Sequence, residues 1–109
     1  MTNQNQAAAP LLRRGLIDGP AAAAQFSYPL GIAVDSTGNI FVGDLGNCVV
    51  RKISSLGVVS TFAGSGGCGG QDGSANASTF NGLAAIVIDS TGNLYVADAA
   101  GNKIRKILQ

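Results

Sequence analysis

The sequence "DSTGNIFVGD" at residues 35–44 returns as "DSTGNLYVAD" at residues 89–98, 54 positions later. Each copy is followed by "RKI", at residues 51–53 and at residues 105–107, with the same offset. Aligning residues 15–55 with residues 69–109 without a gap gives 17 identities in 41 positions. Self-similarity at one fixed period is the signature of a repeat architecture, so we predict two copies of one structural unit.

Each copy has the pattern of a meander of short strands. In the first copy we expect strands within residues 31–35, 40–44, 49–54 and 58–64, separated by turn sequences such as "STGN" and "SLG". Apolar residues fall on both faces of these strands, as at Ile32, Ala33 and Val34. A sheet that is apolar on both faces must be covered on both. Four-stranded antiparallel sheets stacked around an axis meet this need, so we predict an all-β fold of two β-propeller blades.

The phrases "PLGIAVDSTGNIFVGDLGN", "GVVSTFAGSG" and "DGSANASTFNG" resemble NHL repeats, the blades of NHL-type β-propellers. The resemblance covers about residues 15–109, and it implies a first blade with its entry loop at residues 15–64 and a second blade at residues 65–109. We expect the second blade to lack its fourth strand, and residues 1–14 to form an N-terminal tail. The 54-residue offset places residues 4–10 in the register of that strand, so we expect them to pair with residues 103–108, those of a neighbouring chain being favoured. The alternative is a tail that lies on the surface or forms a short helix through its alanines.

Two blades are fewer than the roughly four to eight that close a propeller. We expect completion by oligomerisation or as part of a larger propeller. NHL-type propellers are frequently six-bladed, so the resemblance favours a homotrimer, with a head-to-tail filament as the open form. The leading function is a self-assembling interaction scaffold without catalytic residues or enzymatic activity. The alternative is an RNA- or protein-binding propeller module cut from a larger NHL protein.

Composition narrows the range of partners. The chain has 109 residues, of which 46% are hydrophobic and 12% charged, and its net charge is +1. No apolar run approaches the 18 or so residues that cross a bilayer, so we expect no membrane partner. The sequence has no histidine, which removes the histidine-held metal of NHL-like lyases and histidine-assisted nucleophiles.

Turn residues recur at the ends of the predicted strands in both copies. Carboxylates that cap their own turns explain this repetition better than a calcium site, because every blade needs such turns. We therefore expect structural turns and no bound metal. The residues concerned are Asp35, Gly38, Asn39, Asp44, Asp89, Gly92, Asn93 and Asp98.

The glycine-rich stretch "GSGGCGG" at residues 64–70 has glycines in the G-x-G-x-x-G order of a dinucleotide fingerprint. That fingerprint needs a helix directly after it, and the following "QDGSANAS" does not favour one. We expect a loop between the blades and no cofactor.

A basic pair recurs as Arg51 and Lys52, and as Arg105 and Lys106. The resemblance implies a candidate basic ligand face here, since some NHL propellers bind single-stranded RNA. Bases that are solvated or paired across strands are the favoured alternative.

Cys48 and Cys68 follow the second and fourth predicted strands, which run in the same direction, so both belong at one rim of the first blade. This placement makes them a candidate disulfide. Asn76 begins the sequon "NAS" and is a candidate N-glycan site. Together these features hint at a secreted or extracellular protein.

Overall fold

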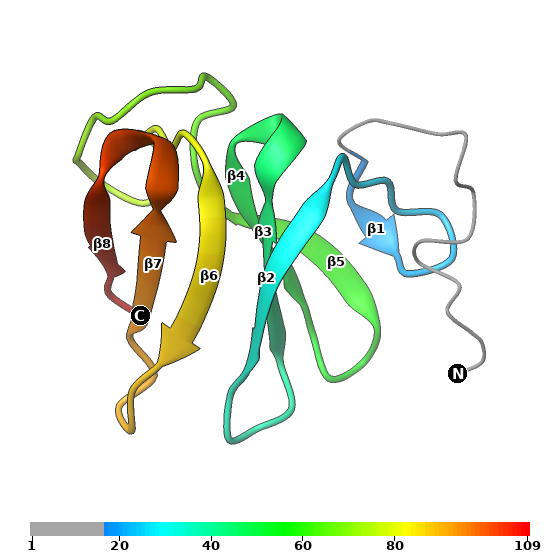
Figure 1. Cartoon of the computed structure of the whole chain (residues 1–109). Helices are drawn as coiled ribbons and strands as arrows, with labels where there is room; N and C mark the ends of the chain where they lie inside the picture. The colour runs from blue at the N-terminus through cyan, green and yellow to red at the C-terminus, as the bar shows by residue number, and fades with distance from the viewer. Residues whose placement is uncertain (1–16) are drawn as a thin grey trace.

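The computed structural model describes residues 17–109 and has two antiparallel sheets, as the sequence predicts (Figure 1). Residues 1–14, with the predicted pairing of residues 4–10, lie outside the described residues. Within residues 17–109, no helix is both long enough and apolar enough to span a membrane.

The first sheet is the first predicted blade with one additional short strand. Its spatial order is β1-β5-β4-β3-β2. The strands are β1 (Gly19–Pro20), β2 (Pro29–Val34), β3 (Ile40–Asp44), β4 (Val49–Ile53) and β5 (Val58–Ala63). The four predicted strands are therefore present, and β1 adds to the outer edge by pairing Gly19 with Val59 and Pro20 with Val58.

The second sheet contains three strands in the order β6-β7-β8. They are β6 (Leu83–Ile88), β7 (Leu94–Asp98) and β8 (Lys103–Ile107). Single-turn 3-10 helices, η2 (Leu45–Asn47) and η3 (Ala99–Gly101), occupy the same place in the two sheets, between the second and third strands. Each is followed by a left-handed residue, Cys48 or Asn102. The repeat in sequence is thus a repeat in structure.

The main core lies between the two sheets, where β2 and β6 run side by side (Figure 1). Both sheets contribute to this one cluster of buried apolar residues. Its members are Phe41, Val50, Ala63, Phe80, Leu83, Ile86, Leu94, Val96 and Ile107. Stacking sheets face to face removes the apolar face of each from water, which is the main driving force for this arrangement.

Gly31 in β2 sets how closely the two sheets approach. A Cβ added at this glycine would lie 2.8 Å from the Cα of Ala85 in β6. Real side chains do not tolerate that distance, so the close packing of the inner strands requires glycine at residue 31.

Candidate functional site: a groove at the edge of the second blade

The turn after β2 is built around the carboxylate of Asp35. Its Oδ1 accepts hydrogen bonds from the backbone N–H groups of Thr37 and Asn39, both at 2.9 Å. Gly38 has φ of 90°, a conformation that glycine adopts at little cost. Desolvation raises the pKa of Asp35, but the hydrogen bonds from Asn39 and Thr37 outweigh it and lower the pKa to about 2.

The turn after β6 repeats this geometry around Asp89. Its Oδ1 accepts from the N–H groups of Thr91 and Asn93, again at 2.9 Å, and Gly92 has φ of 91°. The side-chain hydrogen bond from Thr91 is the largest influence on the pKa of Asp89, which is lowered to about 2. Within residues 17–109, no three histidine, cysteine or acidic side chains gather as metal ligands.

Arg51 in β4 binds the segment that precedes β2, residues 17–28, to the first sheet; we call this segment the entry segment of the first blade. Its guanidinium donates to the backbone oxygens of Ile17 at 2.9 Å and Gln25 at 2.6 Å. It also forms ion pairs with Asp18 at 2.9 Å and Asp44 at 3.0 Å. The side chain is completely buried, and these bonds satisfy its two terminal nitrogens, whereas Nε has no hydrogen-bond partner among the described residues.

Arg105 in β8 makes the same set of contacts 54 residues later. Its guanidinium donates to the backbone oxygens of Gln71 and Thr79, both at 2.9 Å. Its ion pairs are with Asp72 at 2.9 Å and Asp98 at 3.2 Å. An aromatic ring lies against each guanidinium, with centroids 4.4 Å away for Phe26 under Arg51 and 4.8 Å away for Phe80 under Arg105.

These two clusters bear on two expectations from the sequence. Arg51 and Arg105 do not form the exposed basic ligand face given as a candidate, because both side chains are buried; their ion pairs with Asp44 and Asp98 of the neighbouring strands correspond to the favoured alternative of bases paired across strands. The role of Asp44 and Asp98 extends beyond their own turns. Neither accepts a backbone N–H of the 3-10 helix that follows it, although Asp44 Oδ2 accepts from the side chain of Asn47 at 2.8 Å, and both are buried partners of the arginines.

The lysine of each basic pair lies on the other side of its strand. Lys52 Nζ is 5.9 Å from the ring centroid of Phe41, and Lys106 Nζ is 5.5 Å from that of Tyr95. Lys106 is exposed and Lys52 is half-buried, whereas both arginines are buried.

The structure joins Cys48 and Cys68 in a disulfide, with their Cα atoms 5.3 Å apart. The bond ties the start of β4 to the loop that leads into the second blade. Asn76 is exposed in that loop, where its Oδ1 accepts a hydrogen bond from Ser74. Glycosylation and secretion stay predictions.

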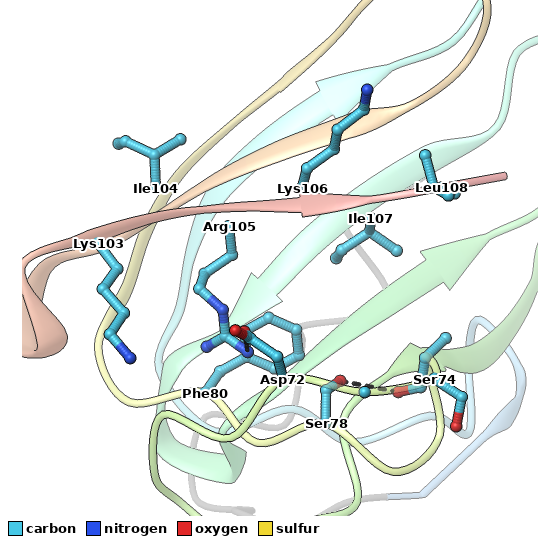
Figure 2. Close-up of a pocket in the computed structure, with 12 residues that line it drawn as sticks. Asp72, Ser74, Ser78, Phe80, Lys103, Ile104, Arg105, Lys106, Ile107 and Leu108 are labelled. Carbon is cyan, nitrogen blue, oxygen red and sulfur yellow. Dashed lines mark hydrogen bonds and ion pairs between the residues drawn. The ribbon is translucent and has the colours of Figure 1, made fainter.

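A groove of about 640 Å³ runs along the outer edge of β8, between that strand and the loop at residues 72–78 (Figure 2). Arg105 and Ile107 point from β8 toward the loop residues Asp72 and Ser74, whereas Lys106 points to the other side of the strand (Figure 2). The groove therefore combines an apolar floor, an ion pair and the backbone of a strand edge. No sequence motif predicts this groove.

Antiparallel sheets stacked face to face, with their inner strands side by side, define a β-propeller module. The NHL repeat family model matches residues 26–53. The chain is 32% identical over 98 residues to Protein SUPPRESSOR OF QUENCHING 1, chloroplastic, of Arabidopsis thaliana, covering 89% of this chain and 9% of that protein. The chain therefore contains an NHL repeat at residues 26–53, and its two sheets have the fold of β-propeller blades.

Solved structures agree with this assignment. A protein of unknown function from Bacteroides thetaiotaomicron superimposes with a TM-score of 0.83 at 35% identity, over 87% of this chain and 24% of that chain. An auxiliary nutrient binding protein from Bacteroides ovatus has a TM-score of 0.77 at 24% identity, over 88% of this chain and 26% of that chain, and shows the fold alone. The chain thus spans about a quarter of these structures and under a tenth of the curated relative.

Proposed function

We propose that this chain is a two-blade interaction scaffold that associates head to tail with copies of itself through the outer faces of its two blades. One of these faces belongs to the first sheet and the other to the second. The support comes from the 54-residue repeat, which relates each outer face to one of the two faces that are buried against each other inside the chain.

By the 54-residue repeat, the outer face of the second sheet is equivalent to the face of the first sheet that packs against the second sheet. Val50 of β4 is fully buried between the sheets, and its equivalent in β8, Ile104, is 73% exposed. Val87 of β6 is likewise exposed and is equivalent to Ala33, which packs against the core. We name Val87, Tyr95 and Ile104 the leading face.

By the same repeat, the outer face of the first sheet is equivalent to the face of the second sheet that packs against the first sheet. Ile86 and Ile88 of β6 pack in or against the core, whereas their equivalents in β2, Ile32 and Val34, are 65% and 62% exposed. We name Ile32 and Val34 the trailing face. Packing the leading face of one copy on the trailing face of the next repeats the internal contact and buries apolar surface that a single copy leaves in water.

Such a contact is heterologous, so it closes into a ring or continues as a filament. Three copies supply six blades, within the usual range for closed propellers, and we propose this trimer as the closed form. The rotation between one copy and the next determines whether the contact closes into a ring or continues as a filament. The mass of the assembly in solution distinguishes the two forms.

Light scattering of the purified chain tests the assembly. We expect a mass three times the 10.9 kDa of the chain at micromolar concentration. Ile32→Asp should give a folded monomer, because it places a charge on a surface that is buried only in the assembly. The control is Leu56→Asp in the turn between β4 and β5, 90% exposed and outside both faces, which should leave the mass unchanged. A monodisperse monomer of the unmodified chain would overturn the proposal.

A further inference from the structure

The disulfide between Cys48 and Cys68 has one buried end and one exposed end. Cys48 is 4% exposed and directly precedes β4, whereas Cys68 is exposed in the loop that leads into the second blade. A reagent in solution therefore has access to Cys68, while the first sheet shields Cys48. Exposed disulfides are reduced more readily than buried ones, and they include the disulfides that act in regulation.

The second blade shows that the turn at Cys48 does not depend on a disulfide. The equivalent residue, 54 positions later, is Asn102, and the two residues have nearly the same left-handed conformation, with φ of 58° and 55°. In each blade, the backbone N–H of this residue donates to the backbone oxygen of the first residue of the preceding 3-10 helix, Leu45 at 3.3 Å or Ala99 at 3.2 Å. Reduction of the disulfide should therefore leave the first sheet intact.

Cys48 fits its turn less well than asparagine would, but it adds redox chemistry. Asparagine adopts the left-handed conformation more readily than most residues, because its short side chain bonds to the local backbone. The turn also accommodates the reduced side chain, since the backbone oxygen of Leu45 lies 3.8 Å from Cys48 Sγ and can accept from a thiol. The first blade thus has room for both the disulfide and the free thiol.

The loop at the exposed end of the disulfide is rich in glycine. Five of the seven residues 64–70 are glycine, a composition that favours a flexible chain. The backbone hydrogen bonds of this stretch join it to a later part of the same loop. From N–H to oxygen they are Gly64 to Ala75, Ser65 to Ser78 and Gly69 to Phe80. The disulfide adds a covalent link from residues 64–70 to the rim of the first sheet.

The later part of the loop carries groups that the second blade uses. Residues 71–82 are equivalent to the entry segment of the first blade, and we call them the entry segment of the second blade. The backbone oxygen of Gln71 and the carboxylate of Asp72 both bind the guanidinium of Arg105 at 2.9 Å. Phe80 is 1% exposed and belongs to the core between the sheets. Freedom gained by residues 64–70 is therefore passed on to this segment.

We propose that Cys48 and Cys68 form a redox site, at which a dithiol reductant frees residues 64–70 from the first sheet and loosens the entry segment of the second blade. The oxidised chain holds this segment against the rim of the first sheet, and the reduced chain lets it move. The site lies outside the leading and trailing faces, so the inference does not rest on the proposed assembly.

The reaction begins at the exposed sulfur. A thiolate of the dithiol attacks Cys68 Sγ, the bond between the two cysteines breaks, and Cys48 leaves as a thiolate that takes up a proton. The second thiolate of the reductant then attacks its own sulfur in the mixed disulfide, and Cys68 leaves and is protonated in turn. The protein disulfide has gained two electrons and two protons, and the dithiol has become a disulfide.

Single variants test which sulfur is attacked. Cys48→Ser leaves only the thiol of Cys68, and Cys68→Ser leaves only that of Cys48. The folded variants are treated with dithiodipyridine, and absorbance follows the release of thiopyridone. The Cys68 thiol should react about tenfold faster or more, because reaction requires access from solvent. Equal rates, or a faster reaction of Cys48, would refute attack at Cys68.

Hydrogen exchange of the full chain, with and without dithiothreitol, tests the release of the loop. Alkylation and intact mass should show two free thiols in the absence of denaturant. Exchange in residues 64–70 should then be about tenfold faster or more, whereas exchange in β4 should be unchanged. Reduction that requires denaturant, a loop whose exchange does not change, or an equal acceleration in β4 would overturn the proposal.

The matched control is the double variant Cys48→Asn, Cys68→Ser, which gives the turn of the first blade the asparagine of the second. Its loop should exchange as fast as that of the reduced chain, and dithiothreitol should have no further effect. A loop that exchanges in this variant as slowly as in the oxidised chain would show that the disulfide does not hold it, and would refute the proposal.

Discussion

At the scale of single residues, one arginine per blade decides how the blade is put together. Arg51 and Arg105 each join a third strand to an entry segment more than 25 residues earlier in the chain. Each also neutralises a completely buried aspartate, Asp44 or Asp98. A buried ion pair adds little stability relative to an apolar pair, but removal of one partner leaves a charge in the protein interior.

Arg51→Met should therefore destabilise the chain by about 3–5 kcal/mol, because Asp44 loses its counter-ion in a place without water. The matched control is Lys52→Met at the next position, where the lost group is a partly exposed ammonium. Its cost should stay below about 1 kcal/mol. Urea unfolding followed by circular dichroism measures both variants, and equal midpoints for the two would show that Arg51 is not a structural residue.

At the scale of elements, the sequence predicts the strands well because their determinants are local. The short apolar run in "IFVGD" and the turn residues of "DSTGN" predict β3 and the Asp35 turn without knowledge of distant contacts. Two features depend on contacts between residues far apart in the sequence, and these features are not predicted from the sequence. The strand β1 is only Gly19–Pro20 and exists because β5 lies beside it. The burial of Arg51 depends on Asp18, 33 residues away, which a local pattern does not pair with it.

The turns at Asp35 and Asp89 should make stability depend on pH in acid. Both pKa values are about 2 in the folded chain, below the ordinary value of 3.8. The stabilisation from these carboxylates is therefore complete above pH 3.8 and is lost as the pH falls toward about 2. Urea midpoints across this range should fall more steeply for the unmodified chain than for the Asp35→Asn, Asp89→Asn double variant. Parallel curves would contradict the prediction.

The disulfide between Cys48 and Cys68 should stabilise the first blade. It closes a loop of 20 residues that contains β4 and β5, and such a loop corresponds to about 3 kcal/mol of lost chain entropy in the unfolded state. Urea unfolding with and without a thiol reductant measures this contribution. The Cys48→Ser, Cys68→Ser double variant should be less stable by a similar amount and should not respond to the reductant. A response by this variant would mean that the reductant acts elsewhere.

At the scale of the whole molecule, the two blades are the same unit in two environments. The first sheet covers one face of the second, and the repeat leaves the complementary faces outside, at Ile32 on one side and Ile104 on the other. Because these faces differ from each other, a copy does not pair with another copy through the same face twice. The proposed contact is directional, so each of its two faces can be disabled by a separate substitution, which is not possible in a symmetric dimer contact.

Two variants, each monomeric alone, should combine into a dimer. Ile32→Asp disables the trailing face and leaves the leading face intact, whereas Val87→Asp does the reverse. In an equimolar mixture, the intact leading face of the first variant meets the intact trailing face of the second. The remaining exposed faces both carry aspartate, so the complex stops at two chains. Light scattering should give twice the chain mass for the mixture and the single mass for each variant, and native mass spectrometry with one isotope-labelled variant should show one chain of each. A mixture that stays monomeric, or one that restores the full assembly, would contradict head-to-tail contact between these faces.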